Sequence, residues 1–350
     1  MTQPSNTPGK PGIGVTAGDP AGIGPEIVLK AVRNAEVLAV CQPVIIACGD
    51  LLRVQAEALG LRCDYPSIDE SILDSVESCD QPFSFDAGRI GDPILPSQVS
   101  AAAGRASMLI IEAAVKLCLG GLLDAIATAP INKGSLKLAG SPFPGHTEML
   151  AHLCGSRDSL MCFFTGRLRV VLLSTHVSLS EAIKLVSTKR IVDAILLTEH
   201  ELKRFGERQP RIAVAGLNPH AGEDGLFGDE EALYIRPAIE ECSGAHGIDV
   251  KGPFPPDTIF ARAARGEFDV VIACYHDQGL IAVKTLAFGK AVNVTLGLPI
   301  IRTSVDHGTA FDIAGRGVAD PGSMIEAIVL AAALVRAQRS SRVNDCAPTG

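Results

Sequence analysis

The stretch Leu168-Arg169-Val170-Val171-Leu172-Leu173-Ser174-Thr175-His176 is an apolar run that leads directly into a histidine. The same pattern recurs twice further along the chain, in Ile212-Ala213-Val214-Ala215-Gly216-Leu217-Asn218-Pro219-His220 and in Val270-Val271-Ile272-Ala273-Cys274-Tyr275-His276. Short β-branched runs are typical of buried parallel strands, whose carboxyl ends border the ligand crevice of an open α/β sheet. One histidine at that edge is more often a capping or core residue, whereas three can converge on a single divalent metal. The pattern therefore predicts an α/β fold with a metal site at one edge of the sheet.

Strand-like runs and helical patterns alternate along most of the chain, which predicts βαβ units and a mostly parallel sheet. The exception is the stretch from about residue 64 to 98, where scattered Pro, Ser and Asp indicate irregular structure. A boundary near residue 130 is expected, with the last helix returning to the first domain. We therefore expect a disordered tail over residues 1–11, a first α/β domain over 12–130 and 303–350, and a second over 131–302.

Composition excludes several classes of protein. The 350 residues are 47% hydrophobic and carry a formal net charge of −8; with no basic cluster, this argues against a nucleic-acid partner. No apolar run reaches the roughly 20 residues that would span a bilayer, and the polar start lacks the order of a signal peptide. The ten cysteines include no C-x-x-C pair, as expected of thiols in a reducing compartment. We expect a cytoplasmic protein with no membrane partner.

Two segments lie where a helix is expected to begin, and each has two interpretations. The glycines of residues 18–24 could expose backbone N–H groups to a phosphate or a dinucleotide. Their spacing matches neither G-x-G-x-x-G nor the P-loop, and an ordinary tight turn explains it equally well. In Pro144-Gly145-His146-Thr147-Glu148, Thr147 could cap the helix, or the N–H groups and His146 could hold a phosphate or a hydroxyl.

Lys284, Asn293 and Arg302 each lie beside an apolar run or near a strand end. A single cation in such a place is usually solvated at the rim, but two cations beside the histidine strands favour an anionic ligand. Residues 306–321 are punctuated by glycines. A backbone that closely approaches a flat cofactor needs such small residues, and an irregular crossover of the Ω type is the alternative.

Five motifs carry a family resemblance. They are Gly18-Asp19-Pro20-Ala21-Gly22-Ile23-Gly24-Pro25, Gly145-His146-Thr147-Glu148, Leu217-Asn218-Pro219-His220-Ala221-Gly222-Glu223, Tyr275-His276-Asp277-Gln278-Gly279 and Arg302-Thr303-Ser304-Val305-Asp306-His307-Gly308-Thr309. From about Gly14 to Glu326 the chain resembles the 4-hydroxythreonine-4-phosphate dehydrogenase family, NAD-dependent enzymes of pyridoxal-phosphate biosynthesis. The wider fold is similar to the isocitrate and isopropylmalate dehydrogenases. The resemblance implies a two-domain αβα sandwich with its active site in the interdomain cleft.

The resemblance also implies roles for individual residues. His176, His220 and His276 match the metal ligands, which agrees with the strand pattern, and Asp257 matches a carboxylate near the metal. Positions that bind the substrate are matched by a second set: His146, Thr147, Lys284, Asn293 and Arg302. The family is a homodimer whose active site straddles the subunit interface, which would allow His276 to come from the neighbouring chain.

NAD is the cofactor that the resemblance implies. The turn with Gly22 and Gly24 is similar to the N-terminal turn of the wider fold, and an adenosine-binding loop is matched by His307, Gly308, Thr309 and Ala310. Asp312 falls where an acidic side chain favours the ribose hydroxyls of NAD and repels the 2′-phosphate of NADP. Three neutral imidazoles suit Zn²⁺ or Co²⁺ better than Mg²⁺, although Mg²⁺ stays open. The catalytic candidates are Lys133, Asp277 and Asp257, and the sequence does not choose the proton acceptor among them.

The implied reaction is the oxidation of 4-phosphooxy-L-threonine at C3, followed by decarboxylation to 3-amino-2-oxopropyl phosphate. The alternative within the family is a dehydrogenase of 4-phospho-D-threonate or 4-phospho-D-erythronate, and other relatives act on cyclic dihydrodiol dicarboxylates. Phosphate acyltransferases share the fold but need neither three strand-end histidines nor the 306–321 loop. A non-catalytic binding protein is the remaining alternative.

Overall fold

The computed structural model describes residues 9–69, 81–287 and 290–345. Its contacts divide the chain into two compact units, Met1–Arg157 with Leu298–Arg336 and Asp158–Gly297 with Ala337–Gly350. Both units are α/β, so the expected fold class is confirmed. Residues 1–8 of the expected disordered tail lie outside the described residues. Within the described ranges, no helix combines the length and the hydropathy needed to cross a bilayer.

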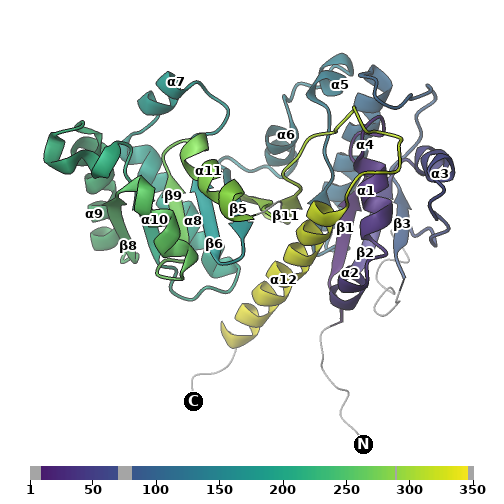
Figure 1. Ribbon diagram of the computed structural model, residues 1–350. Helices are drawn as coiled ribbons and strands as arrows, with labels where there is room; N and C mark the ends of the chain where they lie inside the picture. Colours follow the sequence, from purple (N-terminus) through teal and green to yellow (C-terminus); the bar gives the residue numbers. More distant parts are fainter. Residues whose placement is uncertain (1–8, 70–80, 288–289, 346–350) are drawn as a thin grey trace, which may run out of the picture. The chain divides into compact units, whose positions relative to one another are not determined.

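The first unit has five parallel strands in the order β3-β2-β1-β4-β11. Figure 1 labels β1, β2, β3 and β11 among them. The strands are β1 (Gly12–Thr16), β2 (Gln42–Ala47), β3 (Phe83–Asp86), β4 (Ala125–Thr128) and β11 (Ile301–Ser304). The helices are α1 (Gly24–Ala31), α2 (Ala35–Val40), α3 (Gly49–Ala58), α4 (Ala101–Leu119), α5 (Lys133–Leu138), α6 (His146–Leu153) and the Gly322–Arg336 part of α12 (Gly322–Asp345). β2 and β4 are buried along their whole length, as is usual for parallel strands.

Strand β3 corrects one expectation. It lies inside the stretch 64–98 that was expected to be irregular, and it pairs in parallel with β2 along all four of its residues. The run Phe83-Ser84-Phe85-Asp86 is too short, and too closely flanked by turn residues, for its alternation to stand out. Pairing with an already buried neighbour makes it a strand.

The second unit has six strands in the order β10-β5-β6-β9-β7-β8. The strands are β5 (Leu160–Thr165), β6 (Leu168–Leu172), β7 (Ile212–Ala215), β8 (Val250–Phe254), β9 (Val270–Ala273) and β10 (Val292–Leu296). The helical segments are α7 (Leu179–Lys184), α8 (Thr188–Arg204), η2 (Pro219–Gly225), η3 (Glu231–Ile235), α9 (Arg236–Ala245), α10 (Pro256–Ala264) and α11 (His276–Ala287). β5 runs antiparallel to β10 and β6, and the remaining pairs are parallel.

The three runs that end in a histidine form β6, β9 and β7, which are parallel neighbours in that order. This confirms the central prediction about the fold. Their apolar side chains pack with residues of α10 and α11 in one core that includes Val170, Ala213, Val271, Ile259 and Leu280. Because the strands are parallel and adjacent, the segments that follow them all leave from one edge of the sheet.

Residues 131–157 group with the first unit, whereas the sequence placed them in the second. The reason is close packing of α5 against α4. A Cβ placed on Gly104 of α4 would lie 2.0 Å from the carbonyl oxygen of Ser135 and 2.8 Å from Cβ of Ala139. This contact joins segments that no local sequence pattern relates.

Replacing Gly104 by Ala should destabilise the protein, because neither helix backbone can yield by the distance that the new methyl group needs. We expect a loss of about 1–3 kcal/mol in the free energy of unfolding, measured by chemical denaturation. Gly244, in α9, has open space around its Cβ position, so Gly244→Ala is the matched control and should be neutral or slightly stabilising. Equal stability of the two variants would contradict this account of the α4–α5 contact.

Candidate active site

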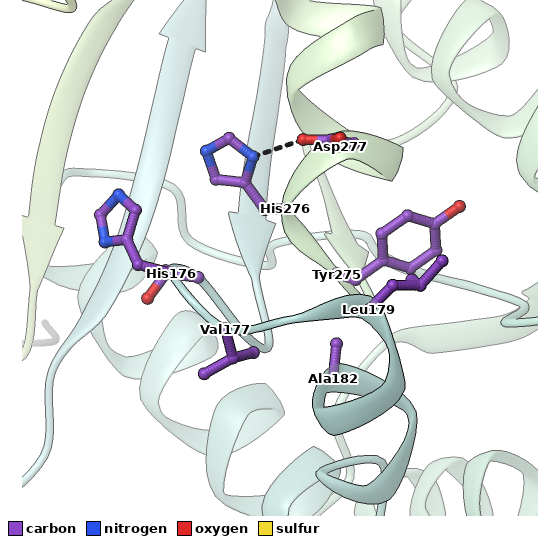
Figure 2. Close-up of a pocket in the computed structure, with 8 residues that line it drawn as sticks. His176, Val177, Leu179, Ala182, Tyr275, His276 and Asp277 are labelled. Carbon is purple, nitrogen blue, oxygen red and sulfur yellow. Dashed lines mark hydrogen bonds and ion pairs between the residues drawn. The ribbon is translucent and has the colours of Figure 1, made fainter.

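The ends of β6 and β9 bring two imidazoles together. His176 follows β6, His276 is the first residue of α11, and their ring centroids lie 5.8 Å apart. Figure 2 shows both rings beside a pocket of about 230 Å³, which is also lined by Tyr275 and Leu179. Asp277 Oδ1 lies 2.7 Å from His276 Nδ1. A proton on Nδ1, shared with this carboxylate, leaves the lone pair of Nε2 available to a metal.

This pair fits a divalent metal but does not complete a site. Imidazole nitrogens bind Zn²⁺ at about 2.0–2.1 Å, so two rings on one ion have centroids no more than about 6 Å apart. The observed separation of 5.8 Å falls within that limit. Across residues 9–69, 81–287 and 290–345, no three His, Cys, Asp or Glu side chains are grouped closely enough to hold an ion. The set of His176, His220 and His276 therefore stays a prediction.

His220 is carried by the tight turn η2 after β7. Its ring is exposed, and the ring centroid lies 6.0 Å from that of Phe227. Helix α10 packs against η2, and its first turn includes the exposed residue Asp257. The structure thus brings the turn of His220 and the helix of Asp257 together, and the place of Asp257 near the metal stays a prediction.

Buried hydrogen bonds tie the three strand ends to one another. Ser174 donates its hydroxyl to the carbonyl of Cys274, which links the segments after β6 and β9. Gln278 accepts a hydrogen bond from Cys274 N–H and donates one to the carbonyl of Gly216, both at 2.7 Å. The hydrogen bond from Gln278 to Gly216 links the end of β9 to the end of β7. Sequence reasoning missed these residues, although Gln278 belongs to one of the five motifs.

A buried cation lies in the first unit. Arg302 is 2% exposed and is the second residue of β11, near the start of that strand. Its Nε and Nη2 donate to the hydroxyl of Thr128, at 3.1 and 2.8 Å. Burial lowers the pKa of this guanidinium to about 10. Sequence reasoning also missed Thr128, a polar residue at the end of an apolar strand.

His146 shares the electrostatic environment of Arg302. It begins α6 after Gly145, and this helix has no side-chain cap. The ring is partly exposed, but its Nε2 is buried and has no hydrogen-bond partner. Burial, reinforced by the positive charge of Arg302, lowers the pKa of His146 well below its ordinary value of 6.5. A buried guanidinium, an unsatisfied imidazole nitrogen and an uncapped helix N-terminus are together suited to an anion.

Two further candidates lie beside His146. Thr147 is the second residue of α6 and is half-buried. Lys133 begins α5 and is exposed, and its Cε lies 3.5 Å from a Cβ placed on Gly145. Lys133 therefore reaches the start of α6.

Lys284 and Asn293 belong to the second unit. Lys284 is exposed on α11, so its ammonium group avoids the apolar core that the sequence pattern suggested around it. Asn293 lies in β10, and its Oδ1 is buried without a hydrogen-bond partner.

The glycines of the 18–24 turn are explained by close packing within the chain. A Cβ on Gly22 would lie 2.8 Å from Cβ of Thr309, and a Cβ on Gly24 would lie 2.2 Å from the carbonyl oxygen of Ala17. Ile23 N–H also donates to the Thr309 carbonyl at 3.0 Å. The turn thus supports the 306–321 loop, and direct cofactor contacts of Gly22 and Gly24 stay a prediction.

The 306–321 loop is anchored by a partly buried ion pair between Glu26 and Lys30 of α1. Glu26, a buried residue of α1, accepts hydrogen bonds from Lys30 Nζ and from Ala319 N–H, both at 2.7 Å. Lys30 also donates to the carbonyls of Gly317 and Ala319. In the first part of the loop, His307, Gly308 and Asp312 are exposed, and Thr309 and Ala310 are half-buried. The candidate cofactor residues therefore lie on a loop whose backbone is hydrogen-bonded to α1.

This chain is similar in sequence and in fold to several known proteins. The profile of the family described as "Pyridoxal phosphate biosynthetic protein PdxA" matches residues 39–331. A 4-hydroxythreonine-4-phosphate dehydrogenase of Desulfosudis oleivorans is 47% identical over 92% of this chain and 95% of that protein. A D-threonate 4-phosphate dehydrogenase of Salmonella typhimurium is 45% identical over 91% and 97%. The crystal structure of a Klebsiella pneumoniae 4-hydroxythreonine-4-phosphate dehydrogenase has a TM-score of 0.86 and 43% identity, and covers 93% of this chain and 100% of that one.

The Lys30–Glu26 pair generates a prediction about the loop. Lys30→Met removes the hydrogen bonds to two loop carbonyls and leaves the Glu26 carboxylate buried, a loss of about 1.5–3 kcal/mol in local stability. Hydrogen exchange followed by mass spectrometry should then show amide exchange in residues 306–321 faster by about tenfold or more. Lys137→Met, on the exposed side of α5, is the control. Unchanged exchange in the Lys30 variant would show that other contacts hold the loop.

The lowered pKa of His146 generates a prediction about pH. Below about pH 6.5 the unfolded chain binds a proton at this residue before the folded protein does, so the free energy of unfolding decreases as the pH falls. The decrease from this one group is up to about 1.4 kcal/mol per pH unit, until the pKa of the folded state is reached. His146→Gln removes it, so denaturation of the variant should depend less on pH between 7 and 5. Parallel pH profiles of the two proteins would contradict the assignment.

Proposed function

Because this chain belongs to the PdxA family of dehydrogenases, we propose that it oxidises 4-phosphooxy-L-threonine at C3 with NAD. The product is a β-keto acid, whose loss of CO2 yields 3-amino-2-oxopropyl phosphate. The observation that carries the proposal is the buried Arg302 beside the unsatisfied Nε2 of His146. A buried guanidinium near an imidazole nitrogen that has no hydrogen-bond partner suits an anionic ligand, and a phosphorylated acid supplies oxygen atoms that such groups bind.

The named relatives support a second substrate. Dehydrogenases of D-threonate 4-phosphate are 45% identical to this chain, nearly as similar as the 47% of the first relative described above. Both substrates carry a phosphate and a hydroxyl beside a further polar group. We therefore retain 4-phospho-D-threonate, with the related 4-phospho-D-erythronate, as the alternative substrate.

Arg302, His146 and Thr147 bind the anionic groups of the substrate in this proposal, and the resemblance adds Lys284 and Asn293. Asp277 already bonds to His276, which suits it to orienting that ring. Lys133 reaches the start of α6 and is the better placed group to exchange a proton with a substrate held at His146. Asp257, on the helix that packs against η2, is the third candidate for proton transfer.

A divalent metal, Zn²⁺, Co²⁺ or Mg²⁺, would be held by His176, His220 and His276. When bound, it would supply Lewis acidity at the reacting hydroxyl, and NAD would accept the hydride. Asp277 fixes the orientation of His276, and the Gln278 hydrogen bonds fix the strand ends behind the histidines. NAD would contact the loop residues His307, Gly308, Thr309 and Ala310, and the exposed carboxylate of Asp312 favours NAD over NADP.

We also propose a homodimer with a shared active site. In the second unit, large apolar side chains are exposed next to the histidines, including Leu179 in the pocket itself and Leu226, which is 71% exposed, just after the turn of His220. Burying such side chains against a second copy is favourable. A second subunit could also supply a third metal ligand, since no three His, Cys, Asp or Glu side chains lie close enough together to hold an ion among the described residues of one chain. The eight cysteines within the described residues are free thiols, which supports a location in the reducing cytoplasm.

A side-by-side rate comparison tests the substrate. The purified protein is assayed for NADH absorbance with NAD, Co²⁺ and either 4-phosphooxy-L-threonine, 4-phospho-D-threonate or 4-phospho-D-erythronate. We expect the first to give the highest kcat/KM and a chelator to abolish turnover. A higher kcat/KM with 4-phospho-D-threonate would establish the alternative substrate, and no NADH with any of the three would refute the proposed activity. His220→Ala should abolish turnover, whereas His200→Ala, on the exposed surface of α8, should retain it.

A further inference from the structure

The turn that carries His220 has a backbone that most residues avoid. Five consecutive residues, from His220 to Asp224, have φ values of 53°, 55°, 83°, 42° and 52°. Only one of them, Gly222, lacks a Cβ, and Gly225 continues the run with φ 91°. Left-handed conformations are disfavoured for residues with a Cβ and normally occur singly. A run of consecutive left-handed residues is strained, and it persists only where the surrounding structure holds it. Backbone strain of this kind clusters at binding sites.

One buried carboxylate enforces this turn. Glu231, which is 2% exposed, begins the π-helical segment η3. Its Oε1 accepts the N–H of Asn218 at 2.7 Å, and its Oε2 accepts the side-chain amide of Asn218 at 3.0 Å. Glu230 accepts a second hydrogen bond from that amide at 2.7 Å. Asn218 lies two residues before His220, and its carbonyl accepts the N–H of Ala221 at 3.1 Å.

The same carboxylate is packed against the inside of the turn. A Cβ on Gly222 would lie 2.8 Å from Glu231 Oε2, and a Cβ on Gly216 would lie 3.2 Å from Oε1. Gly222 also has φ 83°, which favours glycine, and a Cβ on Gly216 would lie 2.8 Å from Cα of Ala221, so the close packing of the turn depends on glycine at both positions. Since the side chain of His220 is exposed, the direction of its ring is set mainly by the backbone that Glu231 holds.

We propose that Glu231, acting through Asn218, is a positioning residue that holds the left-handed turn and so directs His220 toward a divalent metal. The proposal rests on the proposed function, in which His220 is a metal ligand. A role in folding alone would require only that Glu231 stabilise the second unit. The positioning role requires in addition that its loss weaken metal binding through the turn of residues 218–225.

The test measures Co²⁺ affinity of the full-length, metal-free protein by the visible absorbance of the bound ion. Glu231→Gln replaces one acceptor oxygen by an amide nitrogen and removes the charge, so we expect Co²⁺ affinity to fall by tenfold or more. Amide exchange should become faster in residues 216–228 and stay unchanged in β6 and β9. Glu241→Gln makes the same charge change at an exposed position of α9 and should leave both measurements at wild-type values. Where Glu231→Gln does not fold, Asn218→Ala replaces it in the same test.

A rescue variant distinguishes positioning from general stability. Glycine adopts the left-handed conformation without steric cost, so Asp224→Gly lowers the strain that Glu231 has to offset. The double variant Glu231→Gln/Asp224→Gly should regain part of the lost Co²⁺ affinity. Absence of any rescue, together with faster exchange across the whole second unit, would show a purely structural role and overturn the proposal.

His220→Ala separates failure of this inference from failure of the proposed function. If His220→Ala leaves Co²⁺ affinity unchanged, the proposed ligand set is wrong and the positioning role fails with it. If His220→Ala weakens Co²⁺ binding by more than tenfold while Glu231→Gln binds like wild type, only the positioning role is refuted.

Discussion

Parallel pairing of β6, β9 and β7 is the constraint on which the proposed metal site after these strands depends. The strands are buried and adjacent, so hydrophobic packing, together with the backbone hydrogen bonds of the sheet, makes three distant segments emerge at one edge. Polar groups then refine the arrangement: Ser174 and Gln278 join the strand ends, and Glu231 shapes the turn that follows β7. Burial brings the segments together, and hydrogen bonds set the directions of the side chains.

In the first unit the free energy of burial is unfavourable at one residue, Arg302, because a charged guanidinium loses its hydration there. Within β11 this guanidinium donates hydrogen bonds to Thr128. Buried charged groups of this kind cluster at functional sites. The lowered pKa of His146 reflects the same desolvation. Arg302 supplies the positive charge here, whereas the lowered pKa of His146 favours the neutral form of its ring.

Sequence patterns predicted the elements whose signal is local. The histidine strands were recognisable because each combines a β-branched run with a polar terminus, and the substrate candidates were recognisable from motifs. Strand β3 was not, since four residues are too few to show a period. Arg302 and Thr128 are 174 residues apart in the sequence. Glu231 binds Asn218 across a turn whose left-handed backbone could not be predicted from the residue types in it. The contact of α5 with α4 is likewise a matter of shape, since it depends on one absent methyl group. Contacts of this kind are visible only once the chain has folded.

The contacts that hold the 306–321 loop have a consequence for the recognition of a nucleotide. A segment that must become ordered when its ligand arrives gives up part of the binding free energy as lost chain entropy, and its association is slowed by rearrangement. Here hydrogen bonds of Glu26, Lys30 and Ile23 tie the backbone of the loop to the rest of the first unit. A nucleotide that docks on this surface would meet a loop that these contacts hold, so discrimination among nucleotides would depend more on the shape and charge of the loop than on closure of a flexible flap.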